Sequence, residues 1–372
     1  MTTDSQAPVP FVDLGLQHRR IADEVSAAIT AVTDSCAFVL GPPVDAFERQ
    51  FAEYCGVRHC IGVGNGTDAL ELVLRASGVG PGDEVIVPAN TFVATAEAVV
   101  RAGATLALAD CGEDYLLDPV AVARAITPRT RAVFAVHLYG QLAPMKALRD
   151  VCGDDVLLLE DAAQSQGATQ DSRRAGAFGL AAGTSFYPGK NLGAYGDAGA
   201  VMTDSDDVAH AVRQLRNHGG VRKYEHTLIG TNSRLDGIQA AVLSIKLARL
   251  DAWNAERVAA AARYDELLAG VDGVVRPTVA AGNEHVWHLY VVRVAHRDAV
   301  AAALQAAGIG AGVHYPAPVH LLPAFAGLGL GDAGAFPVAE RLAGEILSLP
   351  MFPGITAGQQ ERVVAALRAA LS

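Results

Sequence analysis

The sequence reads Ser185-Phe-Tyr-Pro-Gly-Lys190-Asn-Leu-Gly-Ala194 near the middle of its 372 residues. This stretch sets a single lysine among small and aromatic residues, with no second cation inside it. Such surroundings keep water from the amine, which lowers its pKa and frees the neutral, nucleophilic form. A lone loop lysine is more often simply solvated, so Lys190 needs a second signal before it indicates chemistry.

The second signal lies upstream, where the apolar run 156–159 is followed by Glu160-Asp-Ala-Ala-Gln164. Asp161 could cap a helix that follows a strand. It is equally suited to pair with a pyridinium nitrogen, and a reactive lysine with such an acid is typical of pyridoxal 5'-phosphate (PLP) enzymes. Together the two residues favour this cofactor, with Lys190 and Asp161 as the catalytic pair.

Hydrophobic patterning predicts an α/β fold with a mostly parallel sheet flanked by helices, because short apolar runs alternate with helical stretches. Strands are expected at 60–63, 85–87, 105–109, 132–136 and 156–159, and helices at 67–77 and 95–102. Ligands of such sheets bind at the carboxyl ends of the strands. Loops 64–67, 89–92 and 160–164 fall there.

The length exceeds what one hydrophobic core usually serves, so two domains are expected. A long helical stretch at 235–268 would lead from a large domain, residues 1–250 with an N-terminal helical segment, to a small α/β domain, residues 251–372. The small domain would contain a strand at 290–294 and helices at 298–307, 338–347 and 359–371.

Four more motifs accompany these two: Gly64-Asn-Gly-Thr-Asp68, Pro88-Ala-Asn-Thr-Phe92, Gly230-Thr-Asn-Ser-Arg234 and His314-Tyr-Pro316. With all six in order, from Phe11-Val-Asp-Leu14 to Ser348-Leu-Pro350, the chain resembles the DegT/StrS-type nucleotide-sugar aminotransferases, which are fold type I PLP enzymes. The resemblance implies a large PLP-binding domain, a smaller C-terminal α/β domain and a homodimer with shared active sites.

The resemblance also implies a cofactor-binding set: Gly66, Thr67, Asp68, Phe92, Asp161, Gln164, Ser185, Lys190 and Asn232. The glycine loop at the start of a helix would hold the phosphate, with Ser185 adding a contact. Phe92 would stack on the ring, Asp161 would keep its nitrogen protonated and Gln164 would bond its phenolic oxygen. Asn232 would reach the phosphate held by the other subunit. Alternatives are a core position for Phe92, a solvent-facing Gln164 and a helix cap at Asn232.

On the substrate side we expect Tyr187, His218, Lys223, Tyr224, Arg234, His314, Tyr315 and His320. A nucleotide-sugar is an anion, yet the chain has a net charge of −11. It would therefore need a local cationic patch, and the dense candidate is the basic cluster Arg213, Arg216, His218, Arg222, Lys223 and His226. The alternative is a solvated helix end with a charged loop, and the histidines of the proline-bounded loop could be structural.

Other partners are not expected. The acidic net charge of −11 and the lack of a basic stripe argue against nucleic acid, and no apolar run approaches the ~20 residues that span a bilayer. Residues 1–6 resemble no secretory signal. The five cysteines show no metal-ligand spacing, so free thiols in a reducing cytoplasm, without a metal site, are expected.

The retained Lys190 predicts transamination, since in the sugar dehydratases of this architecture a histidine replaces it. L-glutamate would convert PLP to pyridoxamine phosphate and leave as 2-oxoglutarate, and a nucleotide-linked keto-sugar would accept the amine. The motifs look closest to enzymes that aminate dTDP-3-keto-6-deoxyhexoses for antibiotic sugars. A C-4 keto-sugar and a PLP-binding regulator without turnover are alternatives. A nicotinamide-dependent oxidoreductase is disfavoured, because Gly62, Gly64 and Gly66 do not have the dinucleotide spacing.

Overall fold

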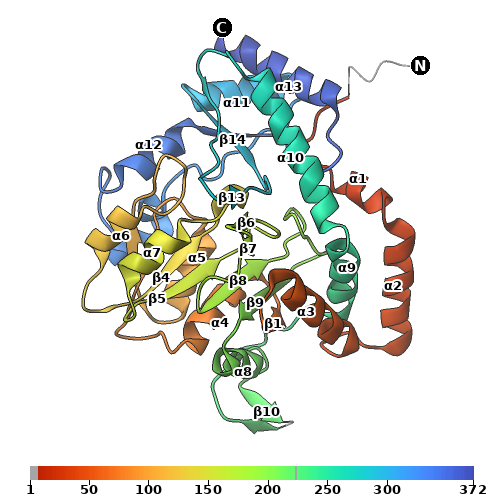
Figure 1. The fold of residues 1–372 in the computed structure, drawn as a ribbon, viewed down its shortest axis with the longest axis vertical. Helices are drawn as coiled ribbons and strands as arrows, with labels where there is room; N and C mark the ends of the chain where they lie inside the picture. The colour runs from red at the N-terminus through yellow and green to blue at the C-terminus, as the bar shows by residue number, and fades with distance from the viewer. Residues whose placement is uncertain (1–6, 223) are drawn as a thin grey trace.

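The computed structural model describes residues 7–222 and 224–372. Lys223, one of the expected substrate-binding residues, lies outside the described residues. Figure 1 shows a central sheet with helices on both sides and a second, smaller unit that carries the C-terminus.

The central sheet has seven strands in the order β1-β9-β8-β5-β4-β2-β3. Their bounds are β1 (His59–Val63), β2 (Glu84–Pro88), β3 (Thr105–Ala109), β4 (Thr130–Val136), β5 (Leu157–Asp161), β8 (Ala181–Ser185) and β9 (Gly199–Thr203). Strands β8, β5, β4, β2 and β3 pair in parallel, and β9 is antiparallel to both of its neighbours. The predicted α/β class with a mostly parallel sheet is therefore confirmed.

Both faces of this sheet are buried, because successive side chains point to opposite sides of a strand. In β4, Phe134 joins the core beneath one set of helices and Val133 the core beneath the other. One face carries α4 (Gly66–Ala76), α5 (Val93–Arg101) and α8 (Asp206–Leu215); the other carries α3 (Pro42–Cys55), α6 (Pro119–Ala125), α7 (Met145–Cys152) and α9 (Gly237–Leu247). The carboxyl ends of the parallel strands therefore lie together at one edge of a sheet that is covered by helices on both faces.

The smaller unit is built on a separate sheet, which has three antiparallel strands in the order β12-β14-β15. It comprises α10 (Leu250–Leu267), β12 (Val274–Val275), β14 (Tyr290–Val294), α11 (Arg297–Ala306), α12 (Pro337–Glu345), β15 (Ile346–Leu349) and α13 (Ala357–Leu371). The N-terminal segment joins it, since Val9 bridges Ile309. The expected boundary after residue 250 coincides with the start of α10 and stays a prediction.

The remaining elements include two N-terminal helices and a projecting hairpin. These are α1 (Leu14–Arg19), α2 (Ala22–Ser35), η1 (Leu138–Gly140), β6 (Thr169–Gln170), β7 (Arg173–Arg174), β10 (Gly220–Arg222), β11 (Glu225–His226), β13 (Asn283–Glu284), η2 (Val319–Leu321) and η3 (Pro323–Leu328). The hairpin of β10 and β11 extends beyond α8 at the bottom of Figure 1, away from the smaller unit.

Two expected helical segments are confirmed with different bounds. The helical stretch at 235–268 consists of two helices, α9 and α10, separated by residues 248–249. The helix expected at 338–347 ends at Glu345, because the apolar run that follows forms β15 and pairs with β14. That pairing is non-local, so helical periodicity around residue 340 gives no warning of it.

Candidate active site

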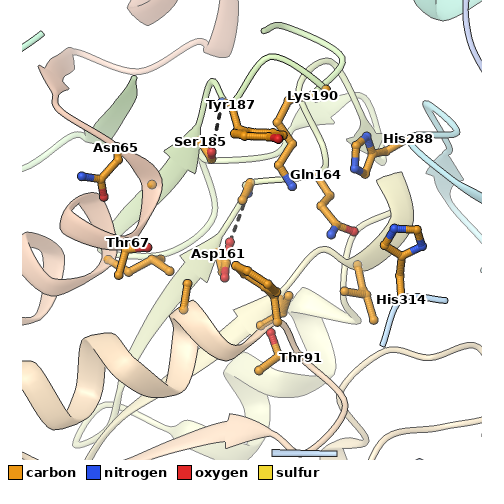
Figure 2. A pocket seen from close by; sticks show the side chains of 18 of the residues that line it. Asn65, Thr67, Thr91, Asp161, Gln164, Ser185, Tyr187, Lys190, His288 and His314 are labelled. Carbon is orange, nitrogen blue, oxygen red and sulfur yellow. Dashed lines mark hydrogen bonds between the residues drawn. The ribbon is translucent and has the colours of Figure 1, made fainter. Parts of the chain in front are cut away.

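A cavity of about 850 Å³ lies at the carboxyl ends of the parallel strands, beneath the smaller unit. Most of the residues predicted from the motifs line it: Gly66, Thr67, Asp68, Phe92, Asp161, Gln164, Ser185, Tyr187, Lys190, His314 and Tyr315. Figure 2 shows the Lys190 amine projecting into this space, with Asp161 below it and Gln164 and His314 to one side. Segments far apart in sequence thus converge on one cavity.

Lys190 follows β8 in a tight turn in which its backbone N–H donates to the Tyr187 carbonyl at 2.8 Å. The surrounding protein desolvates the ammonium group and lowers its pKa to about 8, while the nearby Asp161 charge opposes the shift. A lysine with this pKa has a substantial neutral, nucleophilic fraction near pH 8.

Asp161 is the last residue of β5, not a residue beyond it, and is buried. Its carboxylate accepts hydrogen bonds from the Thr95 hydroxyl at 2.7 Å and from the Ala163 N–H at 3.1 Å. Burial nevertheless raises its pKa, because these two donors do not replace the lost water. The site therefore holds a buried acid that a cationic ligand would stabilise.

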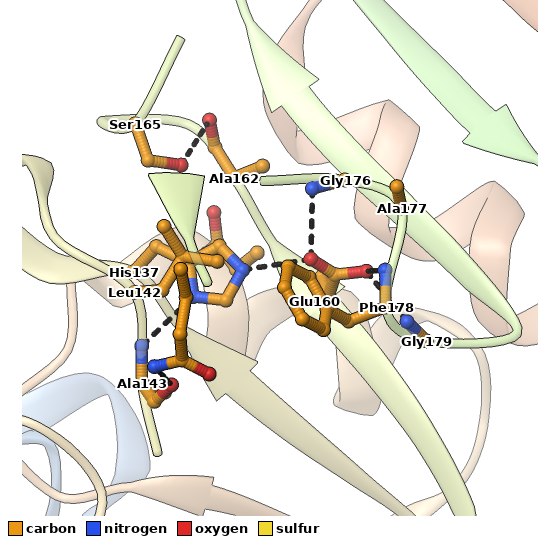
Figure 3. A network of polar contacts seen from close by, with 12 residues as sticks. His137, Leu142, Ala143, Glu160, Ala162, Ser165, Gly176, Ala177, Phe178 and Gly179 are labelled. Carbon is orange, nitrogen blue, oxygen red and sulfur yellow. Dashed lines mark hydrogen bonds and ion pairs between the residues drawn. The ribbon is translucent and has the colours of Figure 1, made fainter. Parts of the chain in front are cut away.

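Glu160 points to the opposite face of β5, where it forms the network in Figure 3. Its carboxylate accepts hydrogen bonds from His137 Nε2 at 2.8 Å and from three backbone N–H groups at 2.6 to 2.8 Å, those of Gly176, Phe178 and Gly179. His137 Nδ1 accepts a hydrogen bond from the Ala143 N–H, so the ring proton is on Nε2, which donates a hydrogen bond to Glu160. Although burial alone would raise it, the pKa of Glu160 is lowered by these donors.

The opposite end of the cavity is built from the start of α4 and the end of β8. A Cβ on Gly66 would lie 2.5 Å from that of Ser185, so only glycine allows the two segments to approach this closely. Asn65 caps the helix by accepting from the Asp68 N–H at 2.8 Å. The Asp68 carboxylate pairs with Arg101 at 3.1 Å, which offsets its charge. Free helical N–H groups with the hydroxyls of Thr67 and Ser185 suit an anion.

His288 also lines the cavity, and no sequence motif pointed to it. Its Nδ1 lies 3.2 Å from Asn191 Oδ1, while Asn191 Nδ2 donates to Asn254 and to the Val286 carbonyl. His288 must therefore carry its proton on Nδ1. Burial and the charge of Lys190 hold its pKa well below the usual value, so the ring is neutral. Thr95 and His137 were missed in the same way.

Five predicted residues do not line this cavity: Asn232, His218, Tyr224, Arg234 and His320. His218, Tyr224 and Asn232 are exposed in and around the projecting hairpin. Arg234 donates to Asn217 Oδ1 at 3.1 Å. His320 is buried and bonded through Nε2 to Glu340 at 3.0 Å. Their substrate and phosphate roles stay predictions.

Arg216 does not belong to the exposed basic cluster in which the sequence placed it. It is buried, pairs with Glu48 at 2.5 Å and donates to the Gly62 carbonyl. A guanidinium engaged in this way is not free to bind an anionic substrate.

Within residues 7–222 and 224–372, no group of three or more His, Cys, Asp or Glu side chains could hold a metal ion. In the same part of the chain, no helix combines the length and apolarity needed to cross a bilayer.

The comparison with known families decides the class of this site. A model described as the DegT/DnrJ/EryC1/StrS aminotransferase family matches residues 19–368. The chain belongs to this aminotransferase family. It is 48% identical over 371 residues to the dTDP-3-amino-3,4,6-trideoxy-alpha-D-glucose transaminase of Streptomyces venezuelae, covering 99% of this chain and 98% of that protein.

A solved structure and a second relative extend the comparison. The crystal structure of S. venezuelae DesV in complex with a ketimine intermediate has a TM-score of 0.95 and 48% identity, covering 98% of each chain. This likeness confirms the expected fold type I architecture. A Geobacillus stearothermophilus protein named pleiotropic regulatory protein is 44% identical over 360 residues, covering 96% of this chain and 96% of that protein.

Proposed function

We propose that this chain is a PLP-dependent aminotransferase that transfers an amine to a nucleotide-linked keto-sugar. The observation that carries the proposal is one cavity that joins the desolvated amine of Lys190, the buried acid Asp161 and an anion-binding helix start at Gly66. These are the attachment point, the ring-nitrogen partner and the phosphate site that PLP requires.

The residues present fit the cofactor at each end. The close approach of Gly66 to Ser185 leaves helical N–H groups and two hydroxyls for the phosphate. Burial raises the pKa of Asp161, and the Thr95 and Ala163 donors and the nearby Lys190 charge offset this only in part, so a protonated ring nitrogen would supply a further countercharge. Phe92 is 48% exposed and offers a face for stacking at the cavity wall.

When bound, PLP supplies an electron sink for the substrate carbon that carries the nitrogen. Asp161 Oδ2, held by Thr95, keeps the ring nitrogen protonated. Lys190 Nζ binds the cofactor and later, as a free amine, holds and returns the proton of the substrate carbon. His288 and His314 line the same space, and burial lowers the pKa of each, so their neutral rings offer hydrogen bonds to a substrate without adding positive charge.

For the acceptor we propose a dTDP-linked 3-keto-6-deoxyhexose of an antibiotic sugar route, with L-glutamate as donor. The named activity of the S. venezuelae relative supports C-3, and a 39% identical GDP-perosamine synthase keeps a C-4 keto-sugar as the second candidate. Incubation with each keto-sugar and analysis of the amino-sugar by mass spectrometry and NMR decides between them. Amination only at C-4 would contradict the C-3 assignment.

We also propose a homodimer in which Asn232 of one chain contacts the phosphate bound by the other. Ser233 beside it is buried and receives the Gly64 N–H at 3.0 Å, while Asn232 itself is exposed. The segment thus touches its own glycine loop and presents Asn232 outward. The nearby exposed groups Tyr224 and Ile229, 84% and 91% exposed, offer a surface for a second copy.

Mixed dimers test the shared site. Lys190→Ala and Asn232→Asp each inactivate both sites of their own dimers, the second by placing a carboxylate against the phosphate. A refolded equal mixture contains dimers with one intact site, so about a quarter of wild-type activity is expected. A mixture as inactive as its components would show that Asn232 acts within its own chain, and an active Asn232→Asp dimer would show that Asn232 does not contact the phosphate.

The visible spectrum of the purified protein with PLP tests the function itself. We expect a band from lysine-bound cofactor that L-glutamate alone bleaches as pyridoxamine phosphate forms. A band that every amino donor leaves unchanged would support a regulator without turnover, as the name of the Geobacillus relative keeps open. If no band forms, the assignment of Lys190 to PLP is wrong.

A further inference from the structure

The orientation of the Gln164 amide is fixed by the backbone. Gln164 Oε1 accepts the N–H of Tyr139 at 2.7 Å. A backbone N–H can only donate, so the oxygen of the amide must face Tyr139 and the nitrogen must face away. Tyr139 keeps a left-handed backbone within η1 (φ 62°) to present this N–H, a conformation that non-glycine residues avoid unless the surroundings require it.

The Gln164 nitrogen then has two protons to place. One is donated to the Tyr315 hydroxyl at 3.0 Å. Gln164 lines the cavity beside Lys190 (Figure 2), so the second proton is available inside the cavity. Two hydrogen bonds, one at the oxygen and one at the nitrogen, leave the amide little freedom to rotate. The direction of the second N–H bond is therefore fixed.

Tyr315 is itself held in place from several sides. Its ring packs on Phe92, with centroids 5.1 Å apart and planes at 37°. The preceding residue is fixed through its carbonyl, which accepts from the Tyr139 hydroxyl, and through its ring, where His314 Nδ1 lies 2.9 Å from Ser348 Oγ. The loop of the smaller unit is thereby tied to the strand ends of the large sheet.

We propose that Tyr315 is a positioning residue that acts through Gln164, aiming the second amide proton at the phenolic oxygen of the bound cofactor. This inference rests on the proposed PLP function and extends it, because it lets a substrate-side loop set the electronic state of the cofactor. A donated hydrogen bond stabilises the phenolate form. The visible band of lysine-bound cofactor titrates with pH, and a well-aimed donor lowers the pKa of that titration.

Tyr315→Phe removes the acceptor and keeps the ring on Phe92. The amide can then turn about its remaining anchor, and we expect the pKa of the visible band to rise by about 1, the effect of one lost hydrogen bond. Tyr139→Phe is the matched control, because it removes a buried hydroxyl that bonds the same loop but leaves the backbone N–H on Gln164. It loosens the loop without removing the acceptor of the amide proton, so it should shift the pKa of the band less than Tyr315→Phe does.

The Gln164→Ala background separates action through Gln164 from direct contact. There, adding Tyr315→Phe should cause no further change in the pKa of the band. A further rise in this background would show that Tyr315 contacts the cofactor itself and would overturn the proposal. An unchanged pKa in the single Tyr315→Phe variant, with wild-type thermal stability, would overturn it too.

The wild-type spectrum keeps the two levels distinct. If the wild-type protein forms no visible band with PLP, the proposed function fails before Tyr315 is tested. If it forms a titrating band and Tyr315→Phe does not move it, the inference about Tyr315 fails while the proposed function stands.

Discussion

Two acids occupy adjacent positions at the end of β5, and their surroundings on the two faces of the sheet shift their pKa values in opposite directions. Glu160 faces the α6 and α7 side, where one imidazole and three backbone N–H groups surround it. Asp161 faces the cavity with two donors. Both are buried, yet the pKa of Glu160 is lowered and that of Asp161 is raised.

The difference separates scaffold from site. A buried charge that the protein satisfies fully belongs to the fold, since its donors fix the loop 176–179 against the strand. A buried charge that the protein leaves short of partners is kept for a ligand that completes it. The same distinction applies to two lysines, Lys190 in the cavity and Lys246 outside it, each with a pKa lowered by burial to about 8.

The two lysines give the largest expected difference. Lys190→Ala should abolish the visible band and slow transamination by about 10⁴-fold or more, since it removes both the attachment point and the proton carrier. Lys246 instead donates to the Gly193 carbonyl at 2.7 Å and sits over the Tyr195 ring, so Lys246→Met should retain the band. Spectra and glutamate-dependent bleaching of both variants measure this. A band lost equally in both would mean that burial alone cannot distinguish a catalytic lysine here.

The sequence predicted the cofactor side of the cavity better than the substrate side. Lys190, Asp161 and the glycine loop at Gly66 stand in compact motifs, where a strand end and the following loop carry the information locally. The burial of Arg216 depends on Glu48, which lies far away along the chain, and the β15 pairing depends on β14. Periodicity does not encode such non-local partners.

His288 and Thr95 were missed for the same reason. Thr95 bonds Asp161 from α5, and His288 reaches the cavity from the segment before β14. Neither residue stands in a marked motif, and only the packed fold shows that His288 lines the cavity with Lys190 and that Thr95 bonds Asp161 from beside it. Asn232 is exposed, and its proposed role depends on a second chain, whose contacts local sequence patterns do not encode.

The two acids of β5 give the next largest expected effects. Substitution of Asp161 should change the transamination rate, and substitution of Glu160 should change the free energy of unfolding. Asp161→Asn should slow transamination on the order of 10³-fold, because the ring nitrogen loses its charged partner. It should leave the cofactor-free protein at least as stable, since a poorly satisfied charge is removed. Glu160→Gln should cost about 3 kcal/mol of unfolding free energy, because an amide nitrogen then faces a backbone N–H.

Urea unfolding of the cofactor-free proteins and glutamate half-reaction rates measure both quantities. The assignment of Glu160 to the scaffold and Asp161 to the site is wrong if Asp161→Asn destabilises the fold as much as Glu160→Gln does. It is also wrong if the Glu160 variant unfolds at the wild-type urea concentration, because the network in Figure 3 would then contribute nothing to stability.

The smallest effect is a pH dependence of opposite sign for the two acids. Glu160 has a folded pKa below its ordinary 4.5, so its stabilisation is present above pH 4.5 and is lost as the pH falls through the folded value. Asp161 has a folded pKa above its ordinary 3.8, so the fold gains stability as the pH falls through that raised value toward 3.8. In urea titrations of the cofactor-free proteins, the stability advantage of Asp161→Asn over wild type should therefore shrink as the pH falls toward 3.8. The deficit of Glu160→Gln should hold down to pH 4.5 and shrink only below it. If the difference in stability between Asp161→Asn and wild type stays constant from neutral pH to 3.8, the pKa of Asp161 is not raised. The buried acid would then not be destabilised in the absence of a cationic ligand.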